Sequence, residues 1–506
     1  MISTNKQIKM GAVISYLAIF INVAAMLIYT PWMKNQIGME NYGLFTLANS
    51  FITMFLMDFG IGSSVARFVS KYRAEGDLEA ANNLVGMVYK LFILIDAVIF
   101  TVLFVLFFFI EQIYQGLTPD EIDLFKQLYI IIAFFSIFSF PFTTLNGLFN
   151  AYEKFVPLKI CDLLQKLLSI TFIVTALLNN GNVVMMVTAN AASGLIVVIL
   201  KLVLVQRLTP IKPNFRIKDK MLLKEILGFS IWVSILGIAQ RLTYNIAPSI
   251  LGIVSNSREI ARYSPASAIA GYFYTFATAI NGLFLPTISR KIAQKKEDDI
   301  LPMMISVGRF QVVVLGMLYV GFATVGRDFM IIWMGDEFTV SYYCVLLLAF
   351  PTIFEYSQQI ANTTIIAKNK VKLQAIGLLA TSIVNLAVSP ILSHYFGAVG
   401  VSTGIVITAF LNFIYQNTLY YRVLKINVFT FYRRCYLPIL IPIVGGILIS
   451  KLLAEIIMVS GWLRIIANGS VSVVVFFGLT IVFHVSKYEK KQIIQMIKGR
   501  TKRGKG

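Results

Sequence analysis

Ionisable side chains interrupt several long apolar stretches of this sequence, and these are the groups most able to do chemistry. The acidic ones are Asp58, Asp96, Asp162 and Glu355, and the basic ones are Lys90, Lys166, Arg241 and Arg309. A charged group at bilayer depth costs several kcal/mol unless it is paired or faces water. Each of these side chains is therefore a candidate for binding an ion or an anionic ligand.

Arg241 is the most demanding of these groups. It stands about thirteen residues from one end of a predicted span over 228–251 and about ten from the other, roughly 15 Å from either surface at 1.5 Å per residue. An arginine this deep can neither snorkel to the surface nor deprotonate. Two interpretations stay open: a permanent ion pair with Asp58 or Glu355, or a wet cavity in which the guanidinium binds an anion.

Asp162 and Lys166 lie four residues apart, which places both on one face of a helix. The spacing predicts that they pair with each other, either as a structural couple or as a couple that an anionic ligand can split. Lys90 and Arg309 lie within about a turn of the predicted cytoplasmic surface. They are expected to act as surface anchors or as further cationic contacts for a substrate.

Glu355 opens a polar stretch, 355–364, that is too hydrophilic to face lipid. Gln358 and Asn362 continue its helical face, so this span is expected to line water. Amides of this kind suit sugar hydroxyls, as guanidinium and ammonium groups suit phosphate. Protonation or sodium binding at Asp58, Asp96, Asp162 or Glu355 could couple transport to an ion gradient.

The elements that position these groups must be membrane helices. Of the 506 residues, 58% are hydrophobic and 13% are charged, and the mean hydropathy is +0.78. A soluble domain of this composition could not bury its apolar surface. The hydropathy predicts an all-α polytopic protein with fourteen spans, near 11–31, 43–66, 87–110, 128–150, 157–178, 183–203, 228–251, 264–287, 306–326, 341–366, 373–393, 398–420, 436–457 and 463–485.

The basic residues orient these spans. When residues near a span end are assigned to the nearer side, 33 of the 44 Lys and Arg fall on the side of the two termini, 7 on the opposite side and 4 deeper inside spans. Basic loops resist translocation, so both termini are predicted to be cytoplasmic in a bacterial inner membrane. The net charge of +20 is then mostly topological. The basic tail, 487–506, is expected to contact anionic lipid, and no nucleic-acid partner is expected.

The sequence also looks doubled. Phe140-Pro141 in the fourth span is matched by Phe350-Pro351 in the tenth, and Lys90 is matched by Arg309. We expect two pseudo-symmetric six-helix lobes, 1–206 and 228–423, joined by a cytoplasmic linker over 207–227. The two added helices would occupy 424–486. Transporters are often built from two such repeats with the binding site between them.

Cofactor and metal chemistry are not expected. The three cysteines, Cys161, Cys344 and Cys435, are widely separated and form no CxxC pair, and there are only two histidines. No nucleotide-binding motif with the required strand and helix is present. Direct use of ATP is therefore not expected, and an ion gradient or the membrane potential would supply the energy.

Two segments resemble a known family. Residues 38–77, GMENYGLFTLANSFITMFLMDFGIGSSVARFVSKYRAEGD, and the turn WMGDEFTVSYYCVLLL at 333–348 resemble bacterial Wzx-type polysaccharide-transport flippases of the multidrug/oligosaccharidyl-lipid/polysaccharide exporter superfamily. The resemblance implies a transporter of lipid-linked oligosaccharide by alternating access of two lobes. It also implies cationic cavity residues for the diphosphate, for which Arg241 and Lys166 are the candidates here.

The sequence thus predicts a non-enzymatic flippase for undecaprenyl-diphosphate-linked oligosaccharides, with a glycan polymerase as a further partner. Whether the glycan becomes lipopolysaccharide, capsule or exopolysaccharide stays open. A multidrug or metabolite exporter of the same superfamily is the nearest alternative. A membrane glycan polymerase or ligase would be an enzyme with a large outer loop, whereas the longest outer connection here spans only about 17 residues, 111–127.

Overall fold

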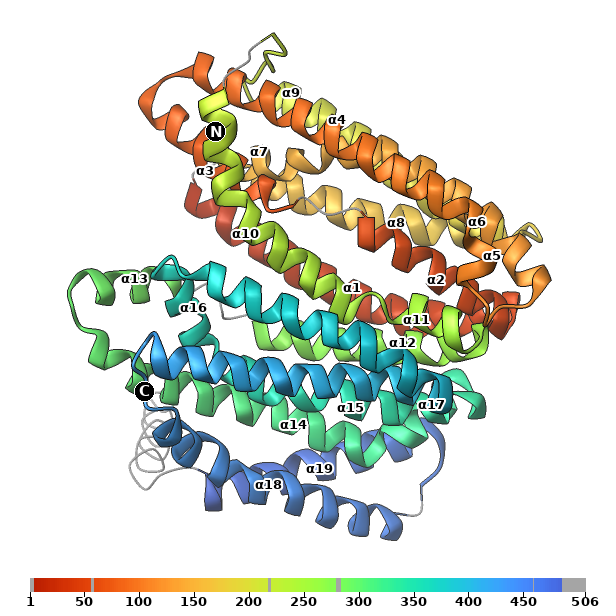
Figure 1. The fold of residues 1–506 in the computed structure, drawn as a ribbon. Coiled ribbons are helices and arrows are strands. Elements are labelled where there is room, and N and C mark those ends of the chain that lie inside the picture. Colours follow the sequence, from red (N-terminus) through yellow and green to blue (C-terminus); the bar gives the residue numbers. More distant parts are fainter. Residues whose placement is uncertain (1–3, 56–58, 217–219, 279–283, 458, 485–506) are drawn as a thin grey trace, which may run out of the picture. The chain divides into compact units, whose positions relative to one another are not determined.

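The computed structural model describes residues 4–55, 59–216, 220–278, 284–457 and 459–484. Every regular element in these ranges is a helix (Figure 1). The elements are α1 (Thr4–Ile37), α2 (Met39–Phe55), α3 (Ile61–Glu75), α4 (Leu78–Phe108), α5 (Ile110–Ile113), α6 (Pro119–Ser139), η1 (Phe140–Thr144), α7 (Leu145–Ala151), α8 (Phe155–Leu178), α9 (Val183–Leu208), α10 (Lys220–Tyr244), α11 (Ala247–Val254), α12 (Ser257–Thr278), α13 (Leu285–Ala293), η3 (Glu297–Asp299), α14 (Ile300–Met334), η4 (Asp336–Phe338), α15 (Thr339–Ser357), α16 (Gln359–Ala367), α17 (Val371–Arg422), α18 (Val428–Ile456) and α19 (Gly461–Phe483).

The prediction of a multi-pass, all-helical membrane protein is confirmed. Within the described ranges, ten helical segments are long and apolar enough to cross a bilayer. The predicted span 43–66 is divided between α2 and α3, and 228–251 between α10 and α11. The span 264–287 lies partly outside the described residues, and 373–393 and 398–420 both fall in α17. The count of fourteen spans stays a prediction.

Local sequence signals explain where the helices begin and bend. Thr118 and Glu121 form a reciprocal capping box at the start of α6, and Pro119 occupies its first turn, where its missing N–H costs nothing. Inside α17 the backbone leaves the helical region at Gly397, with φ 53° and ψ −129°. Only glycine adopts this conformation readily, so α17 is two helical segments joined by a turn.

By packing, the chain divides into two compact units. Unit 1 comprises residues 1–264 and 374–401, and unit 2 comprises residues 265–373 and 402–506. In unit 1, α8 packs on α9 and α1, α6 packs on α9 and α4, and α10 and α11 pack on α3 and α2 respectively. In unit 2, α14 packs against α15, α18 and α19. The predicted arrangement of two six-helix lobes and two added helices stays a prediction.

Aromatic side chains fill the core of each unit. In unit 1 the Phe51 ring lies 5.8 Å from Phe125 and 5.6 Å from Tyr129 in edge-on contacts. In unit 2 the Tyr436 ring lies 5.2 Å from both Phe354 and Phe431. Such pairs add about 0.5–1.5 kcal/mol each beyond the area they bury. These cores hold the helices that carry the polar groups described next.

Candidate functional site

A line of polar side chains runs along α8 and α9 inside unit 1, and we call it the polar track. Its members come from four helices: Asn49 of α2, Asn146 of α7, Asp162, Lys166 and Ser169 of α8, and Asn190 and Lys201 of α9. All are held within one compact unit. The track consists of two bonded groups, one at each end, with Lys166 between them.

One end of the polar track is an ion pair between α8 and α9. The Lys201 Nζ lies 3.0 Å from an Asp162 oxygen and donates to the Asn146 side-chain oxygen at 3.1 Å, while Lys159 Nζ lies 3.6 Å from the other Asp162 oxygen. The Lys201 side chain is only 11% exposed, against 44% for Asp162. Lys201 therefore has the greater need of a counter-charge.

The predicted pair between Asp162 and Lys166 is wrong. Both Asp162 oxygens are used by Lys201 and Lys159, and Lys166 has no ion pair or hydrogen bond within the described ranges. The prediction rested on spacing along one helix. It failed because the buried ammonium of Lys201 arrives from the neighbouring helix, which sequence spacing does not reveal.

Lys166 lies near the middle of α8, with eleven residues before it and twelve after it in the helix. At 1.5 Å per residue this is roughly 17 Å from either end. Residues 162, 166 and 169 share one helical face. Asp162 and Ser169 on this face both bond to α9, yet the Lys166 side chain between them is exposed. Lys166 is thus an accessible ammonium on the inward-packed side of its helix.

The other end of the polar track is a chain of amides. Ser169 Oγ donates to the Asn190 side-chain oxygen at 2.7 Å, and the Asn190 amide donates to the Asn49 side-chain oxygen at 2.8 Å. Sequence reasoning missed Ser169, Asn190 and Lys201. Asn190 and Lys201 are eleven residues apart, which is three helical turns, and this spacing could have indicated one polar face on α9.

Arg241 lies beside a break in its helix and not within a continuous span. It occupies the last turn of α10, and its carbonyl accepts bonds from the backbone N–H groups of Asn245 and Ile246 at 2.9 and 3.1 Å. The break follows from Pro248, which cannot donate a helical hydrogen bond and stands in the first turn of α11. The Arg241 side chain is half-buried.

Asn385 of α17 satisfies the backbone that this break frees. Its side-chain amide donates to the carbonyls of Leu242 and Thr243 at 3.1 and 3.4 Å, and its oxygen accepts from Ser389 at 2.7 Å. Asn385 is fully buried. Interrupted helices are tolerated at membrane depth where buried protein groups re-satisfy the backbone, and transporters build binding sites beside them.

The predicted site residues of unit 2 make local contacts. Arg309 donates to the backbone carbonyl of His484 at the end of α19. The Gln358 amide donates to Asn417 at 2.8 Å, and the Asn362 amide donates to Gln359 at 3.4 Å. Glu355 is half-buried. The structure therefore does not gather these groups with Arg241 and Lys166 within one unit.

Three further predicted residues belong to the first part of the chain. Asp58 lies outside the described residues. Lys90 is half-buried on α4. Asp96, two turns further along α4, is only 8% exposed, and its Oδ1 atom has no hydrogen-bond partner. An acidic group in such a position is unusual, because buried polar groups are nearly always hydrogen-bonded.

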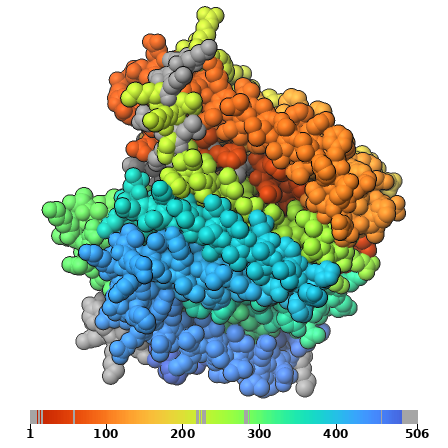
Figure 2. All heavy atoms as spheres, in the orientation of Figure 1, coloured from red at the N-terminus to blue at the C-terminus, as the bar shows by residue number. Residues whose placement is uncertain are grey.

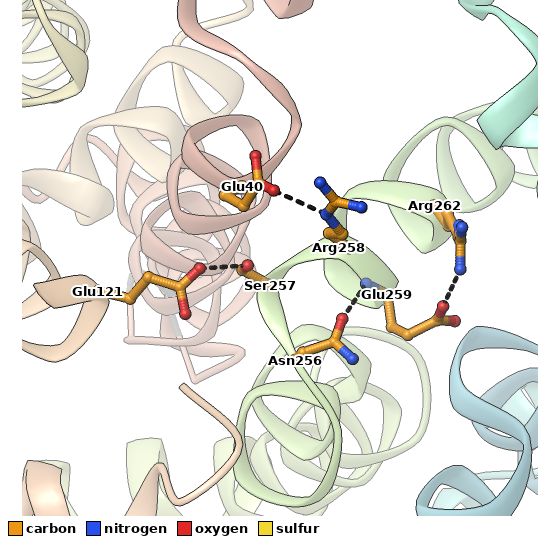
Figure 3. A network of polar contacts seen from close by, with 7 residues as sticks. All are labelled: Glu40, Glu121, Asn256, Ser257, Arg258, Glu259 and Arg262. Atoms are coloured by element: carbon orange, nitrogen blue, oxygen red, sulfur yellow. Dashed lines mark hydrogen bonds and ion pairs between the residues drawn. The ribbon is translucent and has the colours of Figure 1, made fainter. Parts of the chain in front are cut away.

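A second polar cluster surrounds the turn between α11 and α12 (Figure 3). Arg258 donates to Glu40 at 2.7 Å, Ser257 donates to Glu121, and Arg262 pairs with Glu259. The backbone of Glu40 itself and then the hydrogen bond from Arg258 lower the pKa of the Glu40 carboxyl. This cluster fastens the turn to α2 and α6, and most of its side chains are partly buried.

A resident metal has no obvious place. No group of three or more His, Cys, Asp or Glu in the described residues is arranged to hold a metal ion. The three cysteines are buried as free thiols. The chemistry available is therefore binding by ammonium, guanidinium, amide and carboxyl groups.

Comparison with protein families shows which family the chain belongs to. A family model described as polysaccharide biosynthesis protein matches residues 8–291. The chain belongs to this family. The match contains α8, α9, α10 and α11, and hence Lys166 and Arg241. No individually curated protein matches the chain significantly.

Solved structures share the fold of this polysaccharide biosynthesis protein. The lipid II flippase MurJ in an inward closed conformation matches with a TM-score of 0.68 and 13% identity, over 93% of this chain and 98% of that one. An inward-facing multidrug resistance transporter of the MATE family, in the MOP superfamily, matches at 0.62 and 15%, over 76% and 91%. The Vibrio cholerae MATE transporter VcmN in its bent form matches at 0.54 and 12%, over 83% and 98%.

Proposed function

We propose that this protein is a flippase that moves undecaprenyl-diphosphate-linked oligosaccharide repeat units across the bacterial cytoplasmic membrane. Its family is described by polysaccharide biosynthesis, and its fold is shared with a protein named as a lipid II flippase. The predicted topology belongs to the proposal: fourteen spans in two six-helix lobes plus two helices, with both termini cytoplasmic. The protein acts without enzymatic chemistry.

The observation that carries the proposal is the ammonium of Lys166 at the middle of α8, which is accessible and makes no ion pair or hydrogen bond with any described residue. An isolated cation at this depth is costly unless water or an anion reaches it. Its neighbours on the polar track already have partners, so an incoming diphosphate would find Lys166 available without breaking the Asp162–Lys201 pair. Ammonium-to-phosphate contacts are charge-assisted and stronger than neutral hydrogen bonds.

The sugar head group has suitable partners close to this ammonium. The amides of Asn49 and Asn190 lie on the same track, one helical turn and more beyond Lys166. Arg241 is a second cation for the diphosphate, and Gln358 and Asn362 offer further amides. The polyprenyl tail would stay in lipid while alternating access exposes the head group first inside and then outside. A proton or sodium gradient drives this cycle, and a glycan polymerase receives the product.

A reconstituted assay tests the proposal. The probe is a polyprenyl-diphosphate oligosaccharide with a fluorescent sugar, and a membrane-impermeant quencher reports its passage between leaflets. Lys166→Ala should slow initial translocation by about 10-fold to 100-fold, since a hydrogen bond to a charged group is worth about 1.5–3 kcal/mol. Lys166→Arg should retain most activity. Lys224→Ala removes an exposed lysine outside the track and serves as the matched control.

Two results would reject this function. One is a wild-type protein that leaves the probe in its original leaflet. The other is a well-folded Lys166→Ala variant that moves the probe at the wild-type rate. The second candidate, a multidrug exporter, is favoured by the shared fold with the MATE transporters. If the protein is such an exporter, deletion of its gene should reduce the resistance of cells to cationic drugs and leave their surface glycan unchanged.

A further inference from the structure

Asp96 interrupts an otherwise apolar buried stripe on α4. The stripe contains Phe92, Ile99 and Leu103, all of which are buried. The opposite face of the same helix is exposed, including Ile93, Leu94 and Val98. Asp96 therefore faces the protein interior and not the lipid, and it does so without an ion pair or a hydrogen bond to its Oδ1 atom.

Two contacts fix what lies opposite Asp96. The Phe92 ring lies 5.0 Å from Phe140, and Tyr129 donates to the carbonyl of Leu103 at 2.8 Å. The helices α4 and α6 are antiparallel neighbours (Figure 1). Asp96 is four residues after Phe92, and Ser136 is four residues before Phe140. Asp96 is likewise seven residues before Leu103, and Ser136 is seven residues after Tyr129. Ser136 therefore stands level with Asp96.

Ser136 and Ser139 add two more buried oxygens on the facing helix. They are three residues apart and share one face of α6. Ser136 is 1% exposed and Ser139 is 4% exposed, and neither hydroxyl oxygen has a hydrogen-bond partner. Side chains of α4 form part of the outer surface of unit 1 (Figure 2). A carboxyl on α4 and two hydroxyls on α6 are thus all buried, and neither hydroxyl bonds to the carboxyl.

The surroundings of Asp96 provide no nearby counter-charge among the described residues. On α4 itself, Lys90 lies six residues away, roughly 9 Å along the axis. On α6 the charged residues Asp120, Glu121, Asp123 and Lys126 lie in its first turns, beyond Tyr129. On α3 the charged residues, from Arg67 onward, lie beside the start of α4, and η1 has none. Glu111 stands on α5 beyond the far end of α4.

We infer that the buried carboxyl group of Asp96 is a proton-binding site of this transporter. In the conformation described, Asp96 is the neutral acid, and the Ser136 and Ser139 hydroxyls on the facing helix are buried but do not bond to it. A buried carboxylate with no partner is strongly disfavoured, and neutralisation by a proton removes that cost. A metal ion fits less well, because hard cations take about six or more oxygen ligands, whereas Asp96, Ser136 and Ser139 have four side-chain oxygens between them.

This inference deepens the proposed function by naming the group that couples it to a proton gradient. Separation of α4 from α6 would admit water to Asp96 and release the proton. Closure of the two helices would then require a proton to be bound again. The cycle moves one proton on and off a single carboxyl group, with no covalent change.

Infrared difference spectroscopy tests the site without relying on transport. At neutral pH the purified protein should show the C=O band of a buried carboxylic acid, and Asp96→Asn should lose it. Ser136→Ala should leave the band in place, because the Ser136 hydroxyl does not bond to the carboxyl group. Asp162→Asn, which removes a paired and half-exposed carboxylate, should leave the band unchanged. Absence of the band from the wild type, or its persistence in Asp96→Asn, would overturn the inference.

Transport measurements separate this inference from the proposed function. A pH gradient should accelerate movement of the fluorescent polyprenyl-diphosphate probe by the wild type, and Asp96→Asn should lose that acceleration while retaining gradient-free exchange. Retained acceleration in Asp96→Asn rejects Asp96 as the coupling group and leaves the flippase standing. Acceleration by sodium in place of protons also rejects it. A wild type that fails to move the probe rejects the flippase, while the infrared band still decides whether Asp96 holds a proton. Asp58→Asn is measured in parallel, because Asp58 precedes α3.

Discussion

Gly397 offers a sharp test of how the α17 turn is held. Its backbone has φ 53° and ψ −129°, a region that side chains with a Cβ rarely adopt. A Cβ at this position would also lie 2.3 Å from the Glu259 Oε2 atom. That oxygen accepts a 2.8 Å bond from the backbone N–H of Ala398, and the other carboxylate oxygen pairs with Arg262. Gly397→Ala therefore strains the backbone and displaces a carboxylate that is already held.

The two costs can be estimated separately. A residue forced into such a backbone region costs about 1–3 kcal/mol. Movement of Glu259 away from the new Cβ gives up the bond to Ala398, and a hydrogen bond to a charged group is worth about 1.5–3 kcal/mol. We expect Gly397→Ala to destabilise unit 1 by about 3–5 kcal/mol. Gly38→Ala is the matched control, since Gly38 also has a positive φ, 84°, but its Cβ would meet nothing within 4 Å.

Thermal unfolding in detergent, followed with a thiol-reactive dye, provides the measurement. All three cysteines are buried, so dye labelling reports loss of structure. The drop in Tm should be larger for Gly397→Ala than for Gly38→Ala. In a Glu259→Ala background, the difference between these two Tm drops should be smaller, because Gly397 and Glu259 are in contact. Equal drops for the two glycine variants, or an undiminished effect in the Glu259→Ala background, would refute the reasoning.

Two further predictions concern the helix break and the outer cluster. Asn385→Ala should destabilise the fold by about 1–3 kcal/mol, because the carbonyls of Leu242 and Thr243 lose their hydrogen bonds from the Asn385 amide. A Tm equal to that of the wild type would show that the helix break does not need this partner. The pKa of Glu40 is lowered, so its contribution to stability is present at neutral pH and is lost as the pH falls through the folded pKa, below the ordinary glutamate range. The Tm difference between wild type and Glu40→Gln should therefore vanish in acid; a difference that stays constant down to low pH would contradict this.

Much of the fold could be predicted from hydropathy, because long apolar runs must cross the bilayer as helices. The breaks could not be predicted so readily. Pro248 was present in the sequence, but the interruption of its helix depends on Asn385, more than a hundred residues later, to satisfy the freed carbonyls. The turn at Gly397 likewise depends on the carboxylate of Glu259. Contacts of this kind arise only when distant segments pack together.

Only part of the candidate site could be predicted, because its contacts also join helices that are distant in the sequence. Mid-span charge alone was enough to single out Lys166, Arg241 and Asp96. The partner of Asp162 was predicted wrongly, because helix spacing describes neighbours along one helix and not across two. Ser136 escaped notice because a serine in an apolar helix is ordinary. It gains meaning only from its position level with Asp96.

The packing of α10 and of the start of α12 on α3 and α2 within unit 1 bears on how the polypeptide could be divided. Ser64 and Ser230 share a 2.6 Å hydrogen bond, Tyr42 bonds Ser264 at 2.9 Å, and a Cβ at Gly43 would lie 2.1 Å from the Ser257 carbonyl. A polypeptide severed between α9 and α10 would keep the hydroxyls of Ser64 and Tyr42 and the surface at Gly43 on its first fragment. The second fragment would carry their partners, Ser230, Ser264 and the Ser257 carbonyl. These contacts, and not the peptide bond, would then hold the two fragments together.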